Sequence, residues 1–153
     1  MKLSRHHGFT LIELIVTVMI ISILVGLAVP LARNSIKRER ESELRAALRD
    51  IRLAIDKYKD ASDRGFIMVK VDTEGYPETL QLLVDGVQMV GQVDKKLKFL
   101  RRIPLDPMTN STEWGQRSYQ DDPKMSSWGR QNVFDVFTKS EGTALDGTKY
   151  KEW

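Results

Sequence analysis

The strongest pattern in the chain is an uninterrupted apolar stretch close to its N-terminus. From Leu14 to Ala32 there are 19 consecutive residues without a charge, most of them Leu, Ile, Val or Met. A helix rises about 1.5 Å per residue, so these positions reach roughly 28 Å, close to the thickness of a bilayer's hydrocarbon core. Thr17 and Ser22 are compatible with such a span, because their hydroxyls can donate to a carbonyl one turn earlier. The pattern predicts a membrane-spanning helix.

A buried core helix or a secretory signal would account for this stretch less well. A buried helix that is apolar on every side would need a larger protein around it than 153 residues provide. A secretory signal has a shorter apolar region and a cleavage site of small residues, whereas here Pro30 would follow the supposed cut directly. Glu13, at the start of the stretch, also differs from a signal peptide. A carboxylate costs ~2.5–3.5 kcal/mol at membrane depth and therefore needs a partner.

Beyond the apolar stretch, hydrophobic positions recur at steps of three and four residues, which is the period of a helix. No residue that breaks a helix occurs between Pro30 and Gly65, so the two patterns together predict one helix over about residues 9–62. The face that should pack against a globular head comprises Leu44, Ala47, Leu48, Ile51, Ala54, Ile55 and Tyr58.

The polar side of this helix carries charges in regular spacing. Glu41 with Arg45, and Arg52 with Asp56, are placed as favourable i,i+4 ion pairs. A coiled coil with another protein is the lesser alternative for the apolar face, because the pattern lasts only about two heptads. We therefore expect this half of the helix to support the head.

From residue 63 the composition changes to short segments separated by turns. We expect an extended segment at 66–71, a short helix at 78–84, and strands at 117–120 and 133–138. Turn residues between them favour antiparallel pairing. The predicted fold class is α+β, with a small antiparallel sheet packed on the upper half of the long helix.

Residues 95–102 are basic, with Leu97, Phe99 and Leu100 among the charges. Aromatic residues among cations can mark a nucleic-acid surface. A single Phe in a segment of this length is more typical of core packing with solvated charges around it. The 24 basic and 21 acidic residues leave a formal charge of only +3, which gives no support to a nucleic-acid partner.

Composition also argues against an enzyme. The chain has no Cys, and its two histidines are adjacent at His6 and His7. Disulfides, thiolate nucleophiles and Cys-type zinc sites are excluded, and motifs such as HExxH, GxSxG or a phosphate-binding glycine loop do not occur. The neighbouring acids Asp121 and Asp122 precede a proline, which is more typical of a turn than of an acid–base pair.

Residues 8–14, Gly-Phe-Thr-Leu-Ile-Glu-Leu, resemble the class-3 leader junction of type IV pilins and type II secretion pseudopilins. The resemblance implies that prepilin peptidase cuts between Gly8 and Phe9 and that Phe9 becomes an N-methylated first residue. Glu13 would then meet the N-terminal amine of a neighbouring subunit within the filament. Pro30 falls where this family places a helix-kinking proline. Both histidines would leave with the leader.

The resemblance extends to the head. Residues 99–107 resemble a segment of the major pseudopilin of type II secretion, and residues 134–140 with the following loop resemble its C-terminal region. The implied organisation is a leader at 1–8, a transmembrane and filament-core helix at 9–32, the amphipathic half of the same helix at 33–62, and a globular head at 63–153.

Such a protein would be a structural subunit of a pseudopilus that helps to export proteins across the outer membrane. The implied partners are further copies of the chain, prepilin peptidase, minor pseudopilins and an inner-membrane assembly platform. The implied location is the bacterial inner membrane, with a single crossing and a periplasmic head. A type IV pilin acting in adhesion or motility is the alternative, which the missing cysteines disfavour, and a membrane-anchored binding or enzymatic domain is a more distant one.

One feature of the charge distribution opposes this topology. Lys2 and Arg5 precede the span, whereas a larger set of cations follows it: Arg33, Lys37, Arg38, Arg40, Arg45 and Arg49. The positive-inside rule would place the C-terminal side in the cytoplasm. We follow the leader motif, which is the more specific signal.

A hard cation is the one cofactor that the resemblance suggests, since major pseudopilins bind calcium through their C-terminal loop. Ser140, Glu141 and Asp146 are the candidate ligands here, and oxygen donors of this kind suit calcium. The loop is shorter and less acidic than the family's pattern. A metal-free turn with solvated acids is therefore an equal alternative on the sequence alone.

Overall fold

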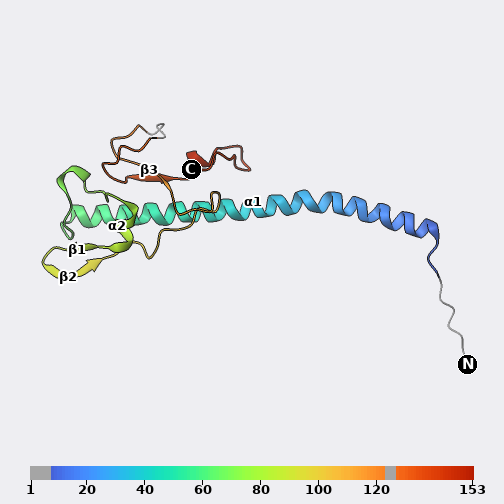
Figure 1. The fold of residues 1–153 in the computed structure, drawn as a ribbon, viewed down its shortest axis with the longest axis horizontal. Coiled ribbons are helices and arrows are strands. Elements are labelled where there is room, and N and C mark those ends of the chain that lie inside the picture. Colours follow the sequence, from blue (N-terminus) through green and yellow to red (C-terminus); the bar gives the residue numbers. More distant parts are fainter. Residues whose placement is uncertain (1–7, 123–126) are drawn as a thin grey trace, which may run out of the picture. The chain divides into compact units, whose positions relative to one another are not determined.

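The structure is a computed structural model that describes residues 8–122 and 127–153, without the side chains of residues 27–31 and 93–94. The predicted leader, apart from Gly8, lies outside the described residues. The element order is α1 (Leu11–Asp63), a 3-10 turn (Val71–Thr73), α2 (Leu80–Asp85), β1 (Val87–Met89), β2 (Gln92–Leu97), β3 (Gly115–Arg117), β4 (Asp135–Phe137) and a second 3-10 turn (Tyr150–Glu152) (Figure 1). The α+β fold class is confirmed.

The chain divides into two units, Met1–Arg38 and Glu39–Trp153. The described part of the first unit is mainly the N-terminal portion of α1, whose large apolar side chains from Leu11 to Val25 are all exposed. The two hydroxyls on this portion donate to helix carbonyls as predicted, Thr17 to Leu14 at 2.9 Å and Ser22 to Val18 at 2.7 Å. Neither hydroxyl is left without an acceptor.

Among the residues described with their side chains, no helix combines the length and the apolar character that a membrane crossing requires. The predicted span, Leu14–Ala32, includes residues 27–31, whose side chains lie outside that description. Pro30 and its predicted kink are among them. Both stay predictions.

The second unit is built on the C-terminal portion of α1. All seven positions predicted for its inner face are buried, which confirms the helical period. They pack with residues of the head to form one core, which includes Ile67, Leu80, Leu83, Trp114, Val133, Val136, Ala144 and Tyr150. In Figure 1 the hairpin β1–β2 and the strand β3 lie on opposite sides of this part of α1. The helix therefore forms the centre of the unit.

The described part of the head contains two antiparallel pairs of strands instead of the single small sheet that we predicted. In one pair Val87 lies opposite Leu97, and the register shifts between Gln88 and Met89. This hairpin was missed, because the charges of β2 suggested a solvated segment. Its turn contains Gly91, whose φ of +78° suits glycine.

The other pair joins β3 to β4, with Gly115 opposite Phe137. The predicted strands at 117–120 and 133–138 were therefore displaced or too long. The first ends at Arg117, because the amide of Ser118 donates to the side chain of Asp121 at 2.7 Å and turns the chain away from the sheet.

Two smaller predictions also need correction. The short helix α2 begins later than predicted, because the Thr79 side chain caps it by accepting from the Leu82 amide at 3.4 Å. The segment 66–71 is not a strand. Only Ile67 pairs, through a single bridge to Met89, and a 3-10 turn begins at Val71.

Candidate functional site

The first candidate site is the start of α1, where Thr10 and Glu13 bond to each other. The Glu13 carboxylate accepts from the backbone N–H of Thr10 at 2.9 Å and from its hydroxyl at 2.8 Å. The Glu13 amide donates in return to the Thr10 hydroxyl oxygen at 3.3 Å. This reciprocal arrangement is a capping box, which satisfies amide groups that a helix start leaves free.

The sequence interpretation gave Glu13 a partner only in a neighbouring subunit and missed this local one. The signal was present, since Thr followed three residues later by Glu, just before an apolar run, is the pattern of a capping box. Within a single chain, Thr10 therefore holds the carboxylate and gives it hydrogen bonds before any second subunit is involved.

The predicted cleavage site lies directly ahead of this cap. Gly8 has no heavy atom from elsewhere in the structure within 4 Å of the position where a Cβ would stand, and Phe9 is 84% exposed. The bond between them precedes Leu11, the first residue of α1, and is not enclosed by other described residues. This position ahead of the helix suits the predicted cleavage, because a peptide bond inside a helix is protected by its hydrogen bonds.

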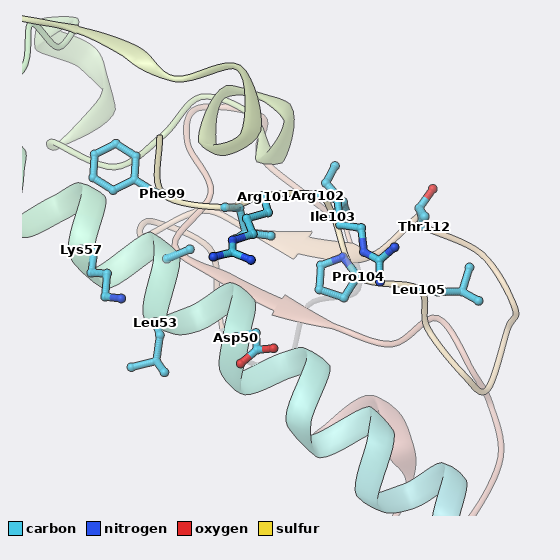
Figure 2. Close-up of a pocket in the computed structure, with 12 residues that line it drawn as sticks. Asp50, Leu53, Lys57, Phe99, Arg101, Arg102, Ile103, Pro104, Leu105 and Thr112 are labelled. Atoms are coloured by element: carbon cyan, nitrogen blue, oxygen red, sulfur yellow. The ribbon is translucent and has the colours of Figure 1, made fainter. Parts of the chain in front are cut away.

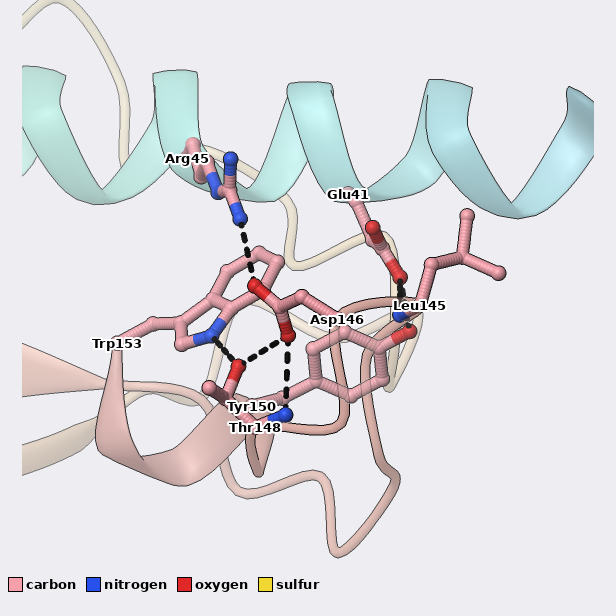
Figure 3. Close-up of polar contacts among 7 residues, drawn as sticks. All are labelled: Glu41, Arg45, Leu145, Asp146, Thr148, Tyr150 and Trp153. Carbon is pink, nitrogen blue, oxygen red and sulfur yellow. Dashed lines mark hydrogen bonds and ion pairs between the residues drawn. The ribbon is translucent and has the colours of Figure 1, made fainter.

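The second candidate site is the C-terminal segment, which contains the predicted calcium ligands. The side chain of Asp146 accepts from the Thr148 amide at 2.9 Å and from its hydroxyl at 2.6 Å, and lies 3.6 Å from the guanidinium of Arg45 on α1 (Figure 3). The bonds from Thr148, assisted by the nearby Arg45 charge, hold the pKa of the Asp146 carboxyl below its usual range.

The other two predicted ligands have different partners. Glu141 pairs with the ammonium of Lys151 at 3.2 Å, and the hydroxyl oxygen of Ser140 accepts from the Gly142 amide at 3.3 Å. Across residues 8–122 and 127–153, no three His, Cys, Asp or Glu side chains come together in a way that could hold a metal ion. Two of the predicted ligands, Glu141 and Asp146, therefore each pair with a different cationic side chain of the same chain.

Residues that the sequence interpretation placed elsewhere make the main contacts to this loop. Glu41 and Arg45 were predicted to pair with each other along α1, but both bond to the C-terminal segment instead. The Glu41 carboxylate is buried and accepts from the hydroxyl of Tyr150 at 2.9 Å. Burial, together with the hydrogen bond to Glu41, raises the pKa of Tyr150 to about 12.

The predicted pair of Arg52 with Asp56 is likewise replaced. The Arg52 guanidinium donates to the Asp135 carboxylate of β4 at 2.7 Å, and so ties α1 to the strand. No local sequence signal indicates this contact, because 83 positions separate the two residues.

A groove of about 760 Å³ lies between α1 and residues 99–105 (Figure 2). Leu53 and Lys57 line it from the helix, and Arg101 and Arg102 from the opposite segment. Phe99 packs on Tyr58 with ring centroids 5.3 Å apart, which confirms the core role predicted for this aromatic residue.

Comparison with known proteins agrees with the N-terminal site. Residues 3–29 match the family model described as the prokaryotic N-terminal methylation motif. The matched residues include Gly8, Phe9 and Glu13. No solved structure matches the chain significantly.

Several curated proteins are similar along most of the chain. The chain is 30% identical to the type II secretion system core protein G of Aeromonas hydrophila over 152 residues, which cover 96% of this chain and 88% of that protein. It is 30% identical to the protein of the same name from Dickeya chrysanthemi over 139 residues, covering 88% and 76% respectively. The Vibrio cholerae serotype O1 protein of this name is 28% identical over 156 residues, covering 95% and 92%.

Proposed function

This chain belongs to the family of type II secretion system core protein G, and from that membership we propose how it is processed, anchored and assembled. It is a structural subunit of a type II secretion pseudopilus, a filament that helps to export proteins across the outer membrane. It acts by polymerising and not by catalysing a reaction.

One observation carries this proposal, the arrangement at the start of α1. The accessible Gly8–Phe9 bond lies just ahead of a capped helix whose large apolar side chains are all exposed from Leu11 to Val25. Apolar surface costs about 25 cal/mol per Å² in water, so a continuous exposed surface of this kind must be covered. Lipid covers it in the unassembled subunit, and the helices of other subunits cover it in the filament.

Prepilin peptidase cuts between Gly8 and Phe9, and Phe9 is then methylated on its new amine. The Glu13 carboxylate, which Thr10 holds in a single chain, becomes available to the cationic amine of a neighbouring subunit. An opposite charge offsets the cost of placing a carboxylate among apolar helices. Pro30, which has no amide to donate, bends the helix so that it packs in the filament core.

Before assembly, the subunit resides in the inner membrane as a single-span protein with its head in the periplasm. Its partners there are the assembly platform and the minor pseudopilins, and later other copies of itself. The cations beyond residue 32 oppose this orientation under the positive-inside rule, so the topology needs its own test. A periplasm-active reporter fused after Trp153 should be active, and activity of a cytoplasmic reporter at the same position would reverse the orientation.

Mass spectrometry of the protein isolated from its own cells tests the processing. We expect a mature chain that begins with N-methylated Phe9. An intact Met1 would contradict assembly and favour a membrane-anchored domain. Deleting the gene then separates the two filament classes, because loss of protein export indicates a pseudopilus and loss of adhesion or motility alone indicates a type IV pilus.

A further inference from the structure

Three side chains of α1, at positions 41, 45 and 52, contact the last part of the chain, and we call this set the helix–loop clamp. Glu41 is the most buried member, with 9% of its surface exposed. Its carboxylate oxygen Oε1 accepts from the Leu145 amide at 2.8 Å and from the Tyr150 hydroxyl at 2.9 Å (Figure 3). Because one buried carboxylate accepts from both donors, it fixes the two ends of the segment between Leu145 and Tyr150.

Arg45 makes the second part of the helix–loop clamp, one turn further along α1. Its guanidinium lies 3.6 Å from the Asp146 carboxylate and 4.1 Å from the centre of the Trp153 ring. The indole N–H of Trp153 donates to the Thr148 hydroxyl at 2.7 Å. One planar cation therefore joins the acid of the loop to the aromatic residue at position 153.

Arg52 makes the third part. Its guanidinium donates to the Asp135 carboxylate at 2.7 Å, to the Val136 carbonyl at 3.1 Å and to the backbone oxygen of Trp153 at 2.7 Å. The same group thus fixes β4 and the end of the following segment against α1. A fork of this kind is geometrically specific, because the donors of a guanidinium are coplanar.

In these contacts, the carboxylates of the loop are paired with cationic side chains of the same chain. Asp146 faces Arg45, Glu141 faces Lys151, and the loop contributes no further carboxylate between residues 140 and 150. Calcium takes six to eight oxygen ligands, typically including several carboxylate oxygens. A guanidinium or ammonium beside the same carboxylate repels a divalent ion. Ser140, Glu141 and Asp146 as placed here do not fit calcium.

We propose that the helix–loop clamp of Glu41, Arg45 and Arg52 fixes residues 140–153 in place of a bound divalent cation, so that the head folds and stays folded without calcium. Only one consequence rests on the proposed function: a pseudopilus subunit of this kind would assemble independently of calcium. The clamp itself concerns folding within one chain.

Thermal unfolding of the full chain in detergent tests the proposal. The melting temperature is measured by circular dichroism with calcium chloride and with a calcium chelator, and calcium is titrated in a calorimeter. We expect equal melting temperatures and no saturable heat. A fall in melting temperature in chelator, or saturable binding that Asp146→Asn removes, would overturn the proposal, because a ligand that binds the folded state raises its stability.

Matched variants test the clamp directly. Glu41→Leu, which removes the acceptor of both hydrogen bonds, and Arg45→Gln should lower the melting temperature by several degrees, equally in calcium and in chelator. Glu43→Leu and Arg49→Gln are the matched changes at exposed positions of α1 whose side chains make no hydrogen bond or ion pair with the described residues, and they should change the melting temperature little. The matched pairs are positions 41 with 43 and 45 with 49. An equal fall in melting temperature for both members of each pair would contradict the clamp.

A milder variant serves where Arg45→Gln does not fold. Arg45→Lys keeps the charge but loses the guanidinium that lies over the Trp153 ring. It should speed proteolysis of residues 140–153 relative to Arg49→Lys, and an unchanged cleavage rate would count against the clamp. The N-terminus of the mature chain, read by mass spectrometry, reports on the proposed function separately.

Discussion

The carboxylate of Asp106 accepts the hydroxyl of Thr138 at 2.5 Å, and neither residue has any exposed surface. The same carboxylate accepts from the Met108 amide at 2.8 Å, and the Thr138 oxygen accepts from the Ser140 amide at 3.1 Å. This chain of hydrogen bonds joins the turn after residues 103–105 to the residue that follows β4. Buried polar groups are costly without partners, so this pair fixes how the two segments meet.

We predict that Thr138→Val lowers the free energy of unfolding by about 1–3 kcal/mol, because it removes the donor to a buried carboxylate while keeping the shape of the side chain. Thr138→Ser keeps the hydroxyl and should cost less, about 1 kcal/mol for the lost methyl group. Chemical denaturation followed by tryptophan fluorescence measures both. Equal losses would mean that packing, and not the hydrogen bond to Asp106, decides the stability here.

Gly115 lies opposite Phe137 in the β3–β4 pair, and a Cβ at this position would stand 2.4 Å from the Phe137 ring. The guanidinium of Arg117 lies 4.5 Å from the centre of this ring and limits its movement on that side. We predict that Gly115→Ala costs about 1–3 kcal/mol through overpacking. Phe137→Leu makes room, so the double variant should lose less than the sum of the two single variants. A strictly additive loss in denaturation would contradict this contact.

The long helix could be predicted from the sequence because its signals are local. Residues between 44 and 58 repeat with the period of a helix, and burial of all seven predicted positions follows from that period alone. The motif around Gly8 and Phe9 could also be recognised, because it is contiguous, and residues 3–29 match a family model. Cleavage at this position stays a prediction. Predictions of this kind need no knowledge of what lies far away along the chain.

The contacts that position the head could not be predicted in the same way. Glu41 and Tyr150 are 109 positions apart, and Asp106 and Thr138 are 32 apart. Glu41 has an ordinary i,i+4 partner in Arg45, so the local pattern suggested a solvated pair and concealed a buried carboxylate. Only the folded structure shows that the charged side chains of Glu41 and Arg45 contact the C-terminal segment.

Stability should depend on pH through Asp121, which accepts from the backbone amides of Ser118 at 2.7 Å and Gly129 at 3.0 Å. These bonds hold the pKa of the Asp121 carboxyl below its usual range. A carboxyl with a lowered pKa in the folded state stabilises fully above its unfolded pKa of about 3.9, and the effect disappears as the pH falls further through the folded pKa.

We therefore expect Asp121→Asn to melt at a lower temperature than the unaltered chain at neutral pH, with the difference shrinking below about pH 4. Melting curves across this range measure it. Asp50→Asn is the control, since it removes an exposed carboxylate that has no hydrogen bond or ion pair to the described residues. A difference for Asp121→Asn that stays constant with pH would show that titration of this carboxyl is not the cause.

The Glu13 carboxylate offers the sharpest test of assembly. Glu13→Val removes the charge from the apolar helix, so insertion into the membrane should be preserved or improved. It also removes the group that we propose to pair with the amine of a neighbouring subunit, so filament formation should be lost or strongly reduced. Membrane fractionation measures insertion, and immunoblots of sheared filaments measure assembly.

Thr17→Val is the matched control, because Thr17 is one turn further along α1 and its hydroxyl donates only to the Leu14 carbonyl of the same helix. Removing it should leave the filament yield unchanged, since the hydrogen bond that is lost lies within its own helix. Cleavage after Gly8 is checked in both variants by mass spectrometry, so that a processing defect is not mistaken for an assembly defect. A normal filament yield from fully cleaved Glu13→Val would show that the carboxylate is not needed between subunits. The Thr10–Glu13 capping box would then be its main role.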